Sequence, residues 1–140
     1  MFKIKVKSLT REIISLAGEL GLKAVAEYRT PDGTRIDVAI LDGEEKLLAI
    51  ELEASFKWFP QRLLYDVVKA HRAGFPKLWV VTPFGSSKAG WILKYAGELN
   101  LAIKILSPEE VEKEMAALSP TSSERGEGCS DPSRRAFSQG

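Results

Sequence analysis

The spacing of apolar residues along the chain switches several times between a helical period and a strand period. An apolar stripe at helical spacing predicts a first helix between the candidate N-caps Ser8 and Thr10 and the stop signal Gly21. The stripe consists of Ile13, Leu16, Ala17 and Leu20. Before this helix, residues 2–7 alternate apolar and basic side chains, which is typical of a short edge strand or an extended arm.

Three short apolar runs separated by turn-forming residues come next and predict an antiparallel meander. The runs cover residues 22–28, 35–41 and 46–53, and the turns are Thr30-Pro31-Asp32-Gly33 and Asp42-Gly43-Glu44-Glu45. Glycine in each turn provides the backbone freedom that a tight reversal needs. We therefore expect the three strands to be neighbours in one sheet.

The second half of the chain alternates predicted helices and strands. Residues 59–73 form a helix with Pro60 in its first turn and Gly74 after its end, and residues 77–82 form a continuous apolar run typical of a buried strand. The remaining elements are a helix from Gly85-Ser86-Ser87 to about residue 99, a strand over 101–106 and a final helix that opens at Ser107-Pro108-Glu109-Glu110. The order predicts an α/β fold with a mixed central sheet flanked by helices.

Length and composition indicate a single folded domain. The chain has 140 residues, of which 44% are hydrophobic, so it can form one core of ordinary size, and we expect this α/β domain to cover residues 1–118. From residue 119 to 140 the sequence changes to Ser, Gly, Pro, Arg and Glu, with almost no large apolar side chain. Such a segment buries too little to offset its ordering entropy, which predicts a disordered polar tail.

Cysteine content and the N-terminal pattern exclude several classes of protein. The single cysteine, Cys129, lies in the polar tail, which excludes a disulfide framework and a cysteine-based metal site. Residues 1–7 lack the apolar run of a signal peptide or a membrane span. We therefore expect a cytoplasmic protein with no membrane segment.

Three carboxylates are predicted to lie on one face of two neighbouring strands. Strand side chains alternate between faces, so Asp37 shares a face with Arg35, Ala39 and Leu41, and Glu51 and Glu53 share a face with Leu47 and Ala49. If Leu41 pairs with Leu47 across the turn, Asp37 lies opposite Glu51. The surrounding residues on both strands are apolar, which indicates interior strands. The three acids therefore converge where carboxylates lose hydration and repel one another.

Such a cluster needs compensation, and the sequence leaves three kinds open: a divalent cation, a basic side chain such as Arg35 or Lys57, or proton uptake. Oxygen ligands suit Mg²⁺ or Mn²⁺ better than zinc. The only histidine, His71, falls near a predicted helix end, where a surface or capping role is expected. The plainer alternative is that Asp37 and Glu51 pair with Arg35 and Lys57 or lie in water at strand ends.

The stretch from Arg11 to Thr82 resembles the PD-(D/E)xK nuclease superfamily, whose restriction-endonuclease-like core has the same αβββαβ order. Asp37 matches the family's Asp, Glu51 matches the Glu of its ExK triplet, and Glu53 stands where the Lys usually lies. The resemblance implies that Asp37 and Glu51 bind the metal and activate water. Glu53 cannot stabilise developing negative charge as a lysine does. It is a candidate metal ligand or general base, and Lys57 is the nearest lysine along the chain.

Further residues match patterns that the family often shows. The family often uses a Glu on its first helix, for which Glu12 is the better candidate and Glu19 and Glu27 are alternatives. The alternative interpretation of Glu12, and more so of Glu19, is a solvated helix glutamate. Gln61 and Tyr65 form a QxxxY pattern that resembles the motif after ExK in the RecB-type branch. Four residues apart on a helix, they share one face and could hold a metal ligand or contact a nucleic-acid strand.

Basic residues are concentrated after the acidic triplet. Between residues 57 and 94 there are seven Lys or Arg and one acid, which suits a polyanion, although ordinary solvated helix positions give the same pattern. The candidate phosphate contacts are Lys57, Arg62, Lys69 and Arg72. Phe56, Trp58 and Phe59 could stack on bases, but packing of the turn between strand and helix is the favoured interpretation.

These observations lead to two hypotheses of different classes. The first is a Mg²⁺- or Mn²⁺-dependent nuclease that hydrolyses nucleic-acid phosphodiester bonds, with DNA favoured over RNA. The second is a nucleic-acid-binding or assembly module that keeps the nuclease fold and has lost the chemistry, as the missing triplet lysine suggests. In either case the partner is a nucleic acid, and the protein could work as a homodimer or within a larger nuclease complex.

Overall fold

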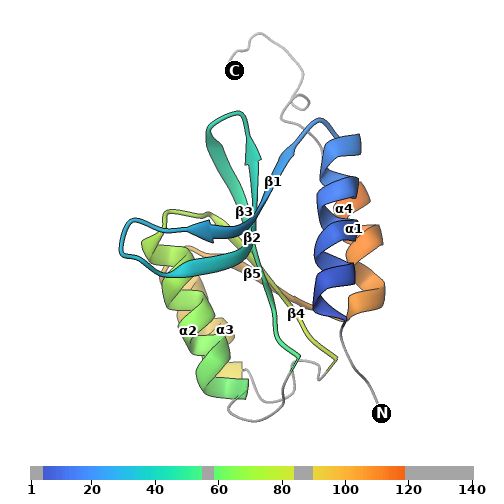
Figure 1. The fold of residues 1–140 in the computed structure, drawn as a ribbon. Helices are drawn as coiled ribbons and strands as arrows, with labels where there is room; N and C mark the ends of the chain where they lie inside the picture. Colours follow the sequence, from blue (N-terminus) through green and yellow to red (C-terminus); the bar gives the residue numbers. More distant parts are fainter. Residues whose placement is uncertain (1–4, 55–58, 84–89, 119–140) are drawn as a thin grey trace, which may run out of the picture.

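A five-stranded sheet carries helices on both faces (Figure 1). The computed structural model describes residues 5–54, 59–83 and 90–118. Its elements are α1 (Val6–Glu19), β1 (Lys23–Arg29), β2 (Arg35–Asp42), β3 (Glu45–Leu52), α2 (Phe59–Arg72), β4 (Lys77–Val81), α3 (Gly90–Glu98), β5 (Ala102–Leu106), the 3₁₀ turn η1 (Pro108–Glu110) and α4 (Val111–Ala117). The α/β class, the meander and the mixed sheet predicted from the sequence are confirmed.

Several sequence predictions fall outside the described residues. They concern Phe2 and Ile4 of the expected arm, the loop residues Phe56, Lys57 and Trp58, the side chain of Phe59, the segment Gly85-Ser86-Ser87 and the expected tail with Cys129. In the described part, no helix is long and apolar enough to cross a membrane.

The strand order is β1-β2-β3-β4-β5, with β1, β2 and β3 antiparallel and β3, β4 and β5 parallel. The crossovers through α2 and α3 both advance in the same direction across the sheet. Because such crossovers are right-handed, both helices must lie on the same face. Figure 1 shows α2 and α3 on one side of the sheet and α1 and α4 on the other. β2 and β3 are interior strands, as the sequence predicted.

Each face of the sheet covers a core of its own. One buried cluster joins the sheet to α2 and α3 and includes Leu63, Val67 and Ile92. The other joins the sheet to α1 and α4 and includes Ile13 and Met115. Each fully buried aliphatic side chain contributes about 1.5 to 3 kcal/mol relative to its exposed state. The two layers therefore hold the strand ends in fixed positions.

Helix α1 begins earlier than the sequence predicted. It starts at Val6 with Lys5 as its N-cap, and the cap makes no side-chain hydrogen bond. The candidate caps Ser8 and Thr10 lie inside the helix, so the expected strand or arm is wrong for the described residues 5–7. The reason is that Leu9 is buried and extends the apolar stripe by one turn toward the N-terminus.

The pairing of β2 with β3 follows the predicted register at the end that carries the acids. Val38 pairs with Ile50 as predicted, and Asp37 and Glu51 are the residues directly beyond this last pair. Leu41, however, pairs with Lys46 and not with Leu47, because a β-bulge falls between Ile40 and Leu41. As a result Leu47 packs against the α1 and α4 core, so the expectation that it shares a face with Glu51 is wrong.

Candidate functional site

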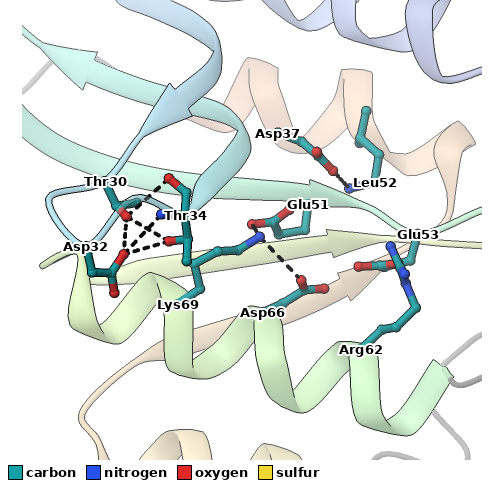
Figure 2. Close-up of polar contacts among 10 residues, drawn as sticks. All are labelled: Thr30, Asp32, Thr34, Asp37, Glu51, Leu52, Glu53, Arg62, Asp66 and Lys69. Carbon is teal, nitrogen blue, oxygen red and sulfur yellow. Dashed lines mark hydrogen bonds and ion pairs between the residues drawn. The ribbon is translucent and has the colours of Figure 1, made fainter.

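Four carboxylates and one lysine meet between the sheet and α2 (Figure 2). They line a cavity of about 260 Å³ together with Gln61, Arg62 and Tyr65. The cluster consists of Asp37 from β2, Glu51 from β3, Glu53 directly after β3, and Asp66 and Lys69 from α2. The site thus lies where the antiparallel meander passes into the parallel half of the sheet.

Asp37 is fixed by the backbone of the neighbouring strand. Its Oδ2 accepts a hydrogen bond of 2.8 Å from the backbone N–H of Leu52. The ladder between β2 and β3 ends at the pair Val38 and Ile50, so the side chain takes the place of the next backbone acceptor. This bond holds the Asp37 carboxylate next to the end of β3 that carries Glu51 and Glu53.

Glu51 is a buried carboxylate paired with a buried lysine. Its side chain is 2% exposed, and its Oε2 lies 2.9 Å from Nζ of Lys69, which is 8% exposed. Burial and the nearby charge of Asp37 raise the pKa of Glu51 to about 8, although Lys69 opposes the shift. Burial by itself would lower the pKa of Lys69, but the Glu51 carboxylate outweighs it and the pKa is raised. Lys69 therefore stays charged and neutralises part of the cluster.

Asp66 is another buried acid and is the single acid in the basic stretch between residues 57 and 94. It lies 4.0 Å from the Nζ of Lys69. Burial, a hydrogen bond with Glu53 and the charges of Glu51 and Glu53 raise its pKa well above the ordinary value. A signal was present: Asp66 falls on the same face of α2 as the buried Leu63 and Ala70, where a solvated acid would not be expected.

Glu53 points toward α2 and is held there by Arg62. The Nε of Arg62 donates a hydrogen bond of 2.6 Å to Glu53 Oε1. The Glu53 side chain is 4% exposed, whereas that of Arg62 is 57% exposed. Arg62 therefore bridges the buried cluster and the surface, and a phosphate arriving from solvent could contact its exposed guanidinium.

The structure brings most of the expected residues together. Asp37, Glu51, Glu53, Gln61, Tyr65, Arg62 and Lys69 all line the same cavity. Tyr65 is 52% exposed, and the Nζ of Lys69 lies 4.9 Å from the centre of its ring. Lys69 differs from the expectation in one respect: it is buried among the acids, so it is not a solvated lysine free to follow a nucleic-acid backbone.

Other expected residues lie elsewhere. Glu12 lines a separate cleft between α1 and the η1–α4 segment, so the structure does not bring it to the acidic cluster, and Glu19 is exposed on α1. Arg72 pairs with Asp32 at 3.2 Å. His71 is exposed near the end of α2, consistent with a surface position.

Arg35 and Lys57 were the two basic residues considered as partners of the acids, and Lys57 lies outside the described residues. Arg35 pairs with Glu27 at 2.8 Å, and both side chains are largely exposed. Arg35 therefore does not pair with Asp37 or Glu51 in this arrangement. The basic group beside Glu51 is Lys69 of α2, which reaches the site because α2 packs on the sheet face that carries Glu51.

The donor chemistry of the cluster suits a hard divalent cation. Glu51 Oε2 is buried and lies 2.9 Å from Nζ of Lys69, and Asp66 Oδ2 is buried and accepts no hydrogen bond from any described residue. Carboxylate oxygens are the ligands that Mg²⁺ and Mn²⁺ prefer. Among the described residues, however, no three acids, histidines or cysteines are already grouped at metal-binding spacing. In the present arrangement the positive charge in the cluster comes from Lys69.

The chain matches no protein-family model, and no curated protein matches it significantly. The functional conclusion therefore depends on the residues of the site and their surroundings.

Proposed function

We propose that this protein is a metal-dependent nuclease that hydrolyses phosphodiester bonds, in DNA more readily than in RNA, and that its core is of the restriction-endonuclease-like, PD-(D/E)xK type. One observation carries the proposal: a buried lysine, Lys69, lies among Asp37, Glu51 and Glu53. Glu53 occupies the triplet position where the family usually has lysine. Lys69 provides from α2 the positive charge that the triplet lacks.

Each residue has a definite task in the proposed reaction. Asp37 and Glu51 would hold Mg²⁺ or Mn²⁺, which when bound lowers the pKa of a water and neutralises phosphate charge. Lys69 stabilises the negative charge that develops on the phosphate during attack. Arg62 keeps Glu53 oriented, and Glu53 accepts a proton from the attacking water. The exposed guanidinium of Arg62 positions the phosphate.

The first experiment compares cleavage by the wild type with that of three variants, Asp37→Asn, Glu51→Gln and Lys69→Met. The substrates are single-stranded, duplex, flap and four-way DNA, each with Mg²⁺ and with Mn²⁺. Each variant should lose at least a hundredfold in rate, as expected when a group that stabilises the transition state is removed. Glu12→Gln is the matched control and should cleave at the wild-type rate, because it lies away from the cluster. Cleavage that persists in both Asp37→Asn and Glu51→Gln would overturn the proposal.

The second candidate function is a catalytically inactive nucleic-acid-binding or assembly module. It is favoured by the ion pair of Glu51 with Lys69, which already supplies a positive charge to the cluster. Calorimetric titration with Mn²⁺ separates the two functions. The nuclease should bind the ion at millimolar concentration, and Asp37→Asn should weaken this binding. An absence of binding in the wild type would favour the inactive module.

A further inference from the structure

A second and larger cavity adjoins the acidic cluster. Its volume is about 860 Å³, and it extends from the first turns of α1 across β1 and β2 to α2. Asp37, Tyr65 and Lys69 line both this cavity and the smaller one that contains the acids. A ligand lying in the larger cavity therefore reaches the acidic cluster without crossing another layer of side chains.

An irregularity in β1 lies at this larger cavity, called the groove from here on. Glu27 has a φ of 52°, in the left-handed region that side chains other than glycine adopt only with strain. The pairing of β1 with β2 includes Ala26 and Tyr28 and skips Glu27, which would otherwise face Asp37. Because Glu27 does not pair, the ladder between β1 and β2 is interrupted beside Asp37.

The groove carries more basic than acidic side chains. Lys7, Arg11, Arg35 and Lys69 line it, against the two acids Glu27 and Asp37. Lys7 and Arg11 lie one turn apart on α1, both exposed, and neither forms an ion pair with another described residue. Basic groups one turn apart along a helix can contact successive phosphates of an extended chain.

We propose that this groove binds a single strand of nucleic acid and directs one of its phosphates to the acidic cluster. Lys7 and Arg11 would contact the backbone, and the exposed ring of Tyr65 would stack on a base where the groove meets the acids. The binding site stands on its own observations, whereas the delivery of a phosphate for cleavage rests on the proposed nuclease function.

The dimensions of the site favour a single strand over a duplex. Glu51 and Glu53, which the phosphate must approach, are only 2% and 3% exposed. Duplex DNA is stiff, with a persistence length of about 150 base pairs, so its backbone cannot follow a narrow path down to buried groups. A single strand can turn its backbone inward and present its bases to an aromatic ring. The volume of about 860 Å³ is that of a small-molecule site, too small to enclose a duplex.

Fluorescence anisotropy of labelled DNA tests the proposal. The probes are an oligo(dT) of about 16 nucleotides and a blunt hairpin duplex, both in EDTA at low salt, so that cleavage does not interfere. The wild type should bind oligo(dT) at least about tenfold more tightly than the hairpin. The double variant Lys7→Glu/Arg11→Glu should lose at least about tenfold in oligo(dT) affinity, with a shallower salt dependence. Tyr65→Ala should lose about fivefold to a hundredfold through lost stacking.

The control is Lys94→Glu/Lys113→Glu, which changes the net charge equally at exposed positions on α3 and α4, away from the groove. It should bind oligo(dT) within about twofold of the wild type, because only the long-range field changes. Circular dichroism confirms that each variant is folded. Equal oligo(dT) affinities of the groove variant and this control would overturn the proposal that the groove binds the strand. Tighter binding of the hairpin than of oligo(dT) would overturn the assignment of a single strand.

The two proposals fail in different ways. If the groove variant binds oligo(dT) like the wild type while metal-dependent cleavage still requires Asp37, the groove proposal is wrong and the nuclease proposal stands. If oligo(dT) binding requires Lys7 and Arg11 but no divalent ion supports cleavage, the groove is correct and the protein is the inactive binding module.

Discussion

Asp32 and Glu51 are both carboxylates of the meander, and their surroundings are opposite. Asp32 lies in the turn between β1 and β2, where Thr30 and Thr34 donate hydrogen bonds to its Oδ1 (Figure 2). Arg72 donates a further hydrogen bond to its Oδ2. The hydroxyl of Thr30, then the hydroxyl and N–H of Thr34, lower the pKa of Asp32 to about 2. This carboxylate is stabilised in its charged form.

Glu51 lies on an interior strand and has the opposite balance. Burial and the charge of Asp37 raise its pKa to about 8, although the ammonium of Lys69 lies 2.9 Å from its Oε2 and opposes the shift. The turn thus uses the Asp32 carboxylate for structure, since hydrogen bonds from Thr30 and Thr34 satisfy its charge. The cluster instead keeps carboxylates under electrostatic stress, as is common where acids bind a cation or take part in chemistry.

The largest expected effect comes from removing the cation of the cluster. Lys69→Met leaves Glu51 and Asp66 buried without the ammonium that neutralises them, so the free energy of unfolding at pH 8 should fall by about 3 kcal/mol. Urea unfolding measures it. At pH 5, where Glu51 is protonated, the loss should be smaller.

The double variant Lys69→Met/Glu51→Gln is the control for this prediction. Removing both members of the pair leaves no uncompensated charge at Glu51, so part of the lost stability should return. A Lys69→Met protein as stable as the wild type at pH 8 would show that Lys69 does not hold the cluster together. The difference between Glu51 and Asp32 would then not be electrostatic in origin.

The second prediction concerns the pH dependence of stability in the wild type. In the folded protein the pKa of Glu51 is raised from 4.5 to about 8, so between these values the folded state binds the proton that the unfolded chain releases. The contribution of Glu51 to stability is therefore present at low pH and decreases as the pH rises through this window. Asp66, whose pKa is also raised, acts in the same direction.

Glu51→Gln should remove most of this slope. Urea midpoints measured from pH 5 to pH 9 for the wild type and for Glu51→Gln provide the test. The variant should be more stable than the wild type at pH 8 if the neutral amide fits the same place. Parallel pH profiles for the two proteins would mean that Glu51 does not titrate as proposed.

Most of the fold followed from local sequence patterns, and the parts that did not depend on tertiary packing. The meander and α2 were predictable because alternation, turn residues and the Pro60 and Gly74 signals are local. The start of α1 was not, because Lys5 caps it without a side-chain hydrogen bond. The β-bulge also could not be predicted, since its extra residue, Leu47, lies in the continuous apolar run 47–50 of β3.

The sequence predicted the strand residues of the acidic cluster, but it predicted the residues of α2 only in part. Strand alternation and register placed Asp37 beside Glu51. The roles of Asp66 and Lys69 depend on how α2 packs against the sheet, which the sequence of α2 does not determine. Glu12 shows the same limit: successive residues of a helix point about 100° apart, so Arg11 lines the groove and Glu12 does not.

The smallest expected effect concerns Asp32 in the turn. Its contribution to stability changes with pH in the direction opposite to that of Glu51. Because the pKa of Asp32 is lowered from 3.8 to about 2, its charged form adds stability above pH 4, and this contribution is lost as the pH falls through about 2. Asp32→Asn should therefore be slightly less stable than the wild type at pH 7 and nearly equal to it at pH 2. Thermal unfolding at the two pH values measures the difference. Glu44→Gln, at an exposed turn position between β2 and β3, is the matched control and should show little change at either pH. An Asp32→Asn deficit that is equally large at pH 2 would show that the carboxylate charge is not what the threonines stabilise.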